Sequence, residues 1–181
     1  MMTPVSLSVL RRNGWRGVPS DPGVYWWYFP VANLQHLKIN DFCSPSELTL
    51  RVAPDGKVCL YHGLANNLAE RVRWHAAQKL TLNNLQSGYL STFRLTLLVL
   101  NQFDYRAGAE SIDAFFDELS ISWLPTKTRI EAENVERMEL GGNFHYPLNI
   151  AGNSCPELRH FLRHLKAARS EYKHLYLSRE H

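Results

Sequence analysis

Two tyrosines, an arginine and a histidine form a pattern that combines proton-transfer groups with a cation. Tyr25 ends the tripeptide GVY and Tyr61 begins the tripeptide YHG, each within a segment rich in β-branched and aromatic residues. Arg71 lies ten residues after Tyr61, and His75 follows Arg71 by four residues. Residues four apart share one face of a helix, so the guanidinium and the imidazole are expected on the same side. A guanidinium binds phosphate through a planar fork of donors, which makes phosphate a natural ligand.

Taken in order, these residues resemble the signature of the GIY-YIG nuclease family. The family is named for two tripeptides, which correspond here to Gly23-Val24-Tyr25 and Tyr61-His62-Gly63. The segment from Asn67 to Arg71, a later glutamate-bearing helix and Pro147-Leu148-Asn149 extend the resemblance, which runs from residue 22 to about residue 153. A valine and a histidine replace the isoleucines of the two tripeptides, and both tyrosines remain in place.

The resemblance implies an endonuclease that hydrolyses DNA phosphodiester bonds with one Mg²⁺ or Mn²⁺ ion. This reaction needs a base to activate water, a cation to stabilise the pentacoordinate phosphate, and an acid or metal-bound water for the leaving oxygen. By position, Tyr25 and Tyr61 would shape the site, and one phenol oxygen would receive or relay the proton of the attacking water. Arg71 would hold the phosphate, His75 would contact phosphate or assist the base, and Asn149 would fix the phosphate or orient a tyrosine.

In the family a glutamate on a helix holds the metal, and the helix expected at residues 129–140 offers several. Its apolar stripe consists of Ile130, Val135 and Met138. Glu131 falls inside that stripe, so the helical wheel predicts that Glu131 faces the sheet, whereas Glu133 and Glu136 would face solvent. The spacing to Asn149 favours Glu136 or Glu133 instead, because family members usually place the glutamate closer to this asparagine. Glu131 is the preferred ligand, because a metal ligand must face the site.

A basic stripe on the last expected helix is a candidate DNA contact. Its lysines and arginines recur at three- and four-residue steps, which is the period of one helix face. The stripe consists of Arg159, Arg163, Lys166, Arg169 and Lys173. The 20 basic residues of the chain exceed its 17 acidic residues by three, and the segment 157–181, with six basic and three acidic residues, accounts for the whole excess. A solvated helix face is the alternative interpretation.

The elements that must position these residues belong to an α+β fold in one domain spanning residues 1–181. The patterns predict a core over about 20–153, an insertion over about 31–54 and a C-terminal helical extension over about 155–178. Strands are expected at 24–29, 57–62 and 120–124, the first two as an antiparallel pair, with an extra strand at 48–52. Helices are expected at 68–79, 109–119, 129–140 and 155–177, with Asn66 or Asn67 as the N-cap of the first. The apolar run 91–100 fits a buried strand or a buried helix, and Ser91 as an N-cap favours the helix.

The composition excludes several classes of protein. A chain with 45% hydrophobic and 20% charged residues buries a sizeable core, which excludes wholesale disorder. The longest apolar run, residues 95–100, is far shorter than the ~20 residues that cross a bilayer. The three cysteines are widely separated and are expected to be reduced thiols. A cytoplasmic protein that binds DNA and no membrane is expected, and the insertion offers a surface for DNA or for homodimer formation.

Two other functions are consistent with parts of this pattern. A DNA-binding module without turnover would keep the same scaffold and lack a working metal glutamate. A protein-interaction domain would use the Trp- and Tyr-rich strand at residues 24–29, and it requires those aromatic side chains to form an exposed patch. The burial of this strand and the placement of the glutamates discriminate among the three.

Overall fold

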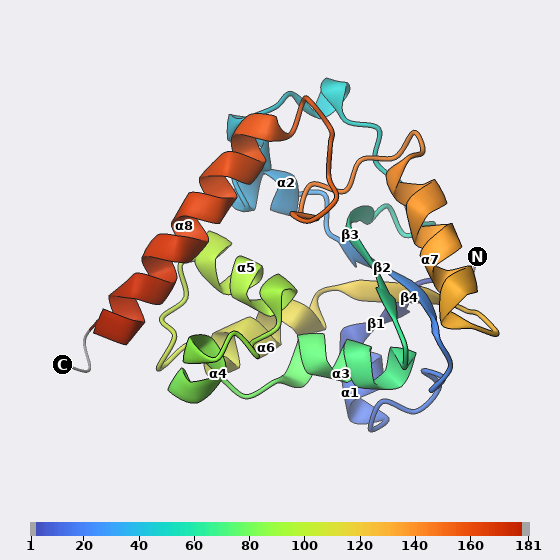
Figure 1. The fold of residues 1–181 in the computed structure, drawn as a ribbon, viewed down its shortest axis with the longest axis horizontal. Coiled ribbons are helices and arrows are strands. Elements are labelled where there is room, and N and C mark those ends of the chain that lie inside the picture. Colours follow the sequence, from blue (N-terminus) through green and yellow to red (C-terminus); the bar gives the residue numbers. More distant parts are fainter. Residues whose placement is uncertain (1–2, 179–181) are drawn as a thin grey trace.

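An antiparallel sheet lies at the centre of the protein, with helices on both of its faces (Figure 1). The computed structural model describes residues 3–178, and within that range the strands follow the order β1-β4-β2-β3. They are β1 (Val5–Ser6), β2 (Gly23–Phe29), β3 (Val58–Ala65) and β4 (Ser120–Pro125). The predicted α+β class and the predicted antiparallel pairing of the two motif strands are both confirmed.

The run of aromatic residues in β2 is buried on both of its faces. Tyr25, Trp27 and Phe29 join the larger core, which also contains apolar residues of the helices α3 (Leu68–Ala77), α5 (Thr92–Leu100), α6 (Ala109–Asp117) and α8 (Arg159–Leu177). Val24, Trp26 and Tyr28 point the other way into a smaller core with Ala132 of α7 (Arg129–Leu140). A strand covered on both faces is apolar at successive positions rather than at alternate ones. The protein-interaction hypothesis is therefore wrong for this strand, because its aromatic side chains form no exposed patch.

Helices pack around the sheet (Figure 1). They are α1 (Leu7–Arg12), α2 (Asn33–His36), α3 (Leu68–Ala77), α4 (Leu82–Gln86), α5 (Thr92–Leu100), α6 (Ala109–Asp117), α7 (Arg129–Leu140) and α8 (Arg159–Leu177). In Figure 1, α7 lies on one side of the sheet, and α3, α5 and α6 lie on the other, with α8 running past α5. None of the described helices is long and apolar enough to cross a membrane.

The caps predicted for the site-bearing helices are present. The side chain of Asn67 accepts a hydrogen bond from the Glu70 backbone N–H at 3.0 Å, and it thereby starts α3. The hydroxyl of Ser91 accepts a bond from the Arg94 N–H at 3.1 Å and starts α5. Each bond satisfies one of the free N–H groups at a helix start. The helix α7 has the predicted bounds, whereas α8 begins four residues later than expected, because residues 156–158 form a turn.

The buried Arg94 holds together the helices that carry the candidate site. It extends from α5, donates to the Ala76 carbonyl of α3 at 3.0 Å and forms a 2.6 Å ion pair with Asp113 of α6. A buried cation is stable only with such partners. Arg94 therefore fixes α3 relative to α5.

The insertion at residues 31–54 is helical and packed rather than an exposed loop. It contains α2 and two 3₁₀ turns, Ile39–Asp41 and Pro45–Glu47. No strand forms at 48–52, where Val52 makes only an isolated bridge with Val58. Phe42 of the insertion packs against Phe161 and His164 of α8. Sequence analysis did not predict β1, α1 or α4, which are short.

His62, the central residue of the second tripeptide, is buried between the sheet and α7. Its Nδ1–H donates to the Tyr25 carbonyl at 3.1 Å, and its ring stacks on Trp26. Its Nε2 has no hydrogen-bond partner within residues 3–178. Burial without an acceptor for a second proton disfavours the imidazolium and lowers the pKa of His62 to about 4.

We expect His62 to make the protein less stable in acid. Between pH 6.5 and about pH 4 the unfolded chain protonates this histidine and the native protein does not. Stability should therefore fall with decreasing pH, with His62 contributing about 1.4 kcal/mol per pH unit in that window. Urea denaturation at intervals from pH 7.5 to 4.5 measures the slope, and His62→Ile should reduce it by about that amount. His160→Gln, at an exposed position of α8, is the control and should leave the slope at the wild-type value.

Candidate active site

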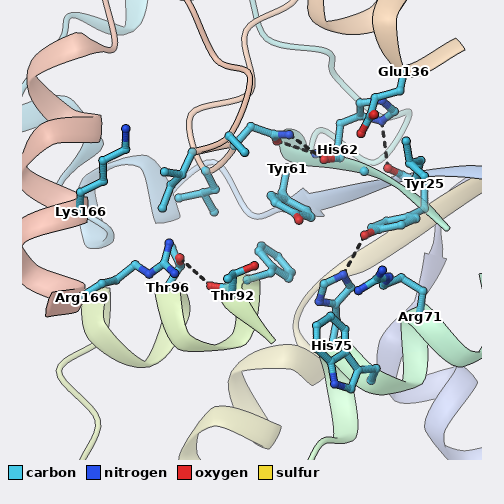
Figure 2. A pocket seen from close by; sticks show the side chains of 18 of the residues that line it. Tyr25, Tyr61, His62, Arg71, His75, Thr92, Thr96, Glu136, Lys166 and Arg169 are labelled. Atoms are coloured by element: carbon cyan, nitrogen blue, oxygen red, sulfur yellow. Dashed lines mark hydrogen bonds between the residues drawn. The ribbon is translucent and has the colours of Figure 1, made fainter. Parts of the chain in front are cut away.

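A cavity of about 610 Å³ opens between the edge of β3 and the helices α3, α5, α7 and α8 (Figure 2). Many of the residues singled out from the sequence line it, namely Tyr25, Tyr61, Arg71, His75, Glu136, Asn149, Lys166 and Arg169. Of the other candidates, Glu131, Arg159 and Arg163 are exposed and do not line it. No described residue of the insertion lines it either.

The register of β2 and β3 places the first motif tyrosine against the glycine of the second motif. Tyr25 pairs with Gly63, and a Cβ at Gly63 would lie 2.5 Å from the Tyr25 hydroxyl oxygen. Only a residue without a side chain leaves room for the phenol in this position. The sequence suggested that this strand ends at His62. The strand β3 instead continues through Gly63 to Ala65, because Gly63 takes part in the pairing with β2.

His75 connects the Tyr25 hydroxyl to a serine. Its Nε2 lies 2.8 Å from the Tyr25 hydroxyl, and its Nδ1 lies 2.6 Å from the Ser91 hydroxyl. Burial, and then the nearby Arg71 charge, lower the pKa of His75 well below its ordinary value, so the ring is neutral. A neutral imidazole carries one N–H, so one ring nitrogen donates and the other accepts. Tyr25, His75 and Ser91 therefore form a chain through which a proton can pass.

Ser91 is the member of this chain that sequence reasoning missed as a site residue. It was predicted as the cap of α5, and it also contacts His75 across 16 residues of sequence. No local spacing relates the two positions, because their contact depends on how α3 and α5 pack.

Tyr61 is held by stacking on an α5 side chain. Its ring lies parallel to Phe93 with centroids 4.2 Å apart, and 6.3 Å from the centroid of Tyr25. Burial raises the pKa of Tyr61 and, more strongly, that of Tyr25, whose value is raised further by Tyr61 and opposed by the charge of Arg71. Both phenols are therefore protonated at neutral pH.

Cations reach the cavity from two sides (Figure 2). Arg71 of α3 has no ion-pair partner among residues 3–178, and its guanidinium lies 4.6 Å from the centroid of the Trp74 ring. On the opposite side, α8 contributes Lys166 and the partly buried Arg169. Burial lowers the pKa of Arg169, and its Nε has no partner in the described part of the chain. Within residues 3–178 none of these positive charges has a salt-bridge partner, so the cavity favours an anion.

The prediction that Glu131 faces the sheet is wrong. Its side chain is exposed, and its carboxylate accepts the Lys127 N–H at 2.8 Å just before α7. The helical wheel failed because Ile130 and Met138, taken as buried, are 69% and 68% exposed. The face of α7 that meets the sheet is instead centred on Ala132, and Glu136 lies at its border.

Glu136, one of the two alternatives favoured by the spacing to Asn149, is the α7 carboxylate that lines the cavity (Figure 2). Burial raises its pKa, the neighbouring Glu133 raises it further, and Arg129 opposes both. No hydrogen bond or salt bridge joins Glu136 to another residue within 3–178. A half-buried carboxylate without such a partner fits a bound cation.

Both polar atoms of the Asn149 side chain form hydrogen bonds to the backbone of the edge strand β3. Its side-chain oxygen accepts the His62 N–H at 2.9 Å, and its side-chain nitrogen donates to the His62 carbonyl at 2.7 Å. The Leu148 N–H also donates to the Leu60 carbonyl at 2.9 Å. The amide thus replaces a neighbouring strand at the otherwise free edge of β3. It holds the strand that carries Tyr61, and the resemblance implied that Asn149 would either fix the phosphate or orient a tyrosine.

A second group of possible metal ligands lies outside this cavity. His145, Cys155 and Glu157 bring ligand atoms within 4.8 Å of one another. These ligand atoms already form hydrogen bonds within the protein. His145 Nδ1 accepts the Thr49 N–H, and the Cys155 thiol donates to the Glu157 carboxylate. A thiol whose pKa is raised by burial is also a poor ligand, since metals bind the thiolate. This group does not compete with the cavity.

We expect Gly63→Ala to displace Tyr25. The added methyl group overlaps the phenol, and overpacking of this kind costs about 1–3 kcal/mol. Chemical denaturation should show that loss. In a Tyr25→Phe background the closest overlapping atom is absent, so Gly63→Ala should cost less there than in wild type. Equal costs in both backgrounds would show that the phenol is not what requires a glycine.

Of the comparisons with known proteins, the one with protein families gave a match. The family described as the GIY-YIG catalytic domain matches residues 23–171, which run from the start of β2 into α8. Neither the curated proteins nor the solved structures gave a match. The matched segment contains every residue that lines the cavity.

Proposed function

Because the chain belongs to the GIY-YIG catalytic-domain family, whose members are nucleases, we propose that it is a metal-dependent endonuclease that hydrolyses DNA phosphodiester bonds. The observation that carries the proposal is the position of Arg71, a guanidinium that has no salt-bridge partner in the described part of the chain and lies beside the chain Tyr25–His75–Ser91. Such a site binds a phosphate and accepts a proton at the same place, as phosphodiester hydrolysis requires.

Tyr25 relays the proton of the attacking water in this proposal. The raised pKa of Tyr25 makes a stable phenolate unfavourable in the free protein, so the phenol needs an acceptor for its own proton. The unprotonated Nε2 of His75 is that acceptor, and Ser91 accepts the Nδ1–H on the other side of the ring. As water transfers a proton to the Tyr25 oxygen, the phenol proton moves to His75. The negative charge of the bound phosphate compensates the imidazolium that forms.

In this proposal the cations bind different parts of the nucleic acid. Arg71 binds the scissile phosphate, because it lies nearest to the proton relay and is free to donate. Lys166 and Arg169 bind the backbone on the opposite side of the cavity. Arg159 and Arg163 lie on the exposed surface of α8 outside the cavity, where they extend the positive surface towards DNA.

Glu136 is the residue that would hold the Mg²⁺ or Mn²⁺ ion. The fit rests on its half-buried carboxylate, which has no bonded partner within the described chain and carries a raised pKa. Mg²⁺ is usually bound by one or two carboxylates and several waters, so a single glutamate is sufficient. When bound, the ion supplies positive charge at the phosphate and a water of lowered pKa for the leaving oxygen. A carboxylate in this cavity also supports an active enzyme over an inactive DNA-binding module.

Replacing Arg71 with alanine should lower DNA cleavage by about 100-fold or more, because a donor aimed at developing charge is lost. Cleavage of supercoiled plasmid with Mg²⁺ or Mn²⁺ measures the effect. The matched control is Arg73→Ala, which removes an exposed arginine two residues along α3 and should cleave at close to the wild-type rate. Equal activity of the two variants would refute the role of Arg71, and binding without cleavage by wild type would favour the inactive module.

Two of the α7 glutamates, Glu136 and Glu131, provide a matched pair of variants that tests the metal site. Glu136→Gln should abolish saturable Mn²⁺ binding, measured by calorimetry, and should abolish cleavage, because the amide removes the negative charge at the cavity. Glu131→Gln, at an exposed position on the same helix, should retain both. Retained Mn²⁺ binding by Glu136→Gln together with its loss in Glu131→Gln would reverse the assignment.

A further inference from the structure

The active-site cavity continues along α3 into a second, open hollow of about 660 Å³. Arg71 and Trp74 line both spaces, so the hollow begins where the proposed phosphate site ends. Its far side is formed by Gly88 and Tyr89, in the segment between α4 and α5. A group placed in this hollow would be a direct neighbour of the phosphate held by Arg71.

Tyr89 presents an exposed ring from a fixed backbone. Its side chain is 65% exposed, although the next residue, Leu90, is buried. The Gln78 side chain donates to the Tyr89 carbonyl at 3.0 Å and accepts the Ser91 N–H at 2.7 Å, which ties this segment to α3. The ring therefore lies at the side of the hollow, on a tethered backbone, and is not part of the core.

The space beside this ring is open. Gly88 has a positive φ of 74°, and a Cβ added there would meet no atom within 4 Å. The Trp74 and Tyr89 rings are 6.1 Å apart and tilted by 59°, so they do not stack face to face. Arg71 lies over the Trp74 ring. The hollow therefore combines two aromatic rings with a cation at one end.

We propose that Trp74 and Tyr89 form a stacking subsite for an unpaired nucleobase next to the phosphate bound by Arg71. This inference rests on the proposed nuclease function and names its substrate class. Aromatic side chains bind unpaired bases by stacking, at about 1–3 kcal/mol per base. A base inside an intact duplex already stacks on its neighbours and must be unstacked before it enters such a subsite, at a cost of a few kcal/mol. The substrate is therefore DNA with an unpaired base beside the bond that is cut, as at a flap, gap or frayed end.

Binding of short oligonucleotides without divalent metal tests the subsite separately from cleavage. The full chain is titrated into fluorescein-labelled single strands that differ only in a central nucleotide, either intact or abasic, and anisotropy gives the Kd. Wild type should bind the intact strand more tightly. Tyr89→Ala should weaken binding to the intact strand by about 5- to 150-fold, the equivalent of one stacked base. The difference between intact and abasic strands should shrink in the same variant.

Two further variants keep the test specific. Tyr89→Phe retains the aromatic face and should bind the intact strand as wild type does. Met138→Ala truncates an equally exposed apolar side chain on α7, outside both cavities, and should also match wild type. Equal wild-type affinity for intact and abasic strands would overturn the subsite, as would equal losses in Tyr89→Phe and Tyr89→Ala.

Cleavage assays then separate this inference from the proposed function. With Mg²⁺ or Mn²⁺, wild type should cut a duplex that carries one unpaired nucleotide faster than the fully paired duplex, and Tyr89→Ala should reduce that ratio. Cleavage of neither substrate would contradict the nuclease proposal, while the binding data would still decide the subsite. Equal cleavage of both substrates by wild type would overturn the substrate class and leave the nuclease proposal standing.

Discussion

The contact between Gly63 and the Tyr25 phenol is the constraint on which the candidate site depends. It requires β2 and β3 to pair in one register, because a slip by one residue would turn Tyr25 to the opposite face of the sheet. That face is occupied by α7 and the smaller core. In the observed register the phenol meets His75 on α3, and α3 follows β3 after a two-residue connection. The motif tyrosines, the glycine and the helix are thus parts of one geometric arrangement.

Burial gives this arrangement its electrostatic character. The same desolvation raises the pKa of Tyr25 and lowers that of His75, so both groups are neutral and share a proton without a net charge. The charged groups stand around them: Arg71 on one side, Arg169 across the cavity, and Glu136 on α7. In the proposed function, a negatively charged substrate meets a preformed set of cations and a neutral relay, which is the preorganisation that favours charge developing at a phosphate.

Sequence reasoning predicted the elements well where the evidence was local. The cap residues Asn67 and Ser91 marked two helix starts, and the apolar patterns indicated the main strands and helices. It failed where tertiary packing decides. The helical-wheel prediction for α7 took the apolar Ile130 as a marker of the buried face, but the sheet covers only the side centred on Ala132. The contact of His75 with Ser91 likewise depends on helix packing, which no local spacing encodes.

The long insertion illustrates how a segment outside the cavity supports the site. Its Phe42 packs on Phe161 and His164 near the start of α8, and other apolar residues of the insertion join the larger core. The helix α8 also packs along α5, so it is held from two sides. Lys166 and Arg169 project from the middle of this helix into the cavity. These two cations have no salt-bridge partner within residues 3–178, so they repel Arg71 and each other, and the packing of α8 on both sides opposes that repulsion.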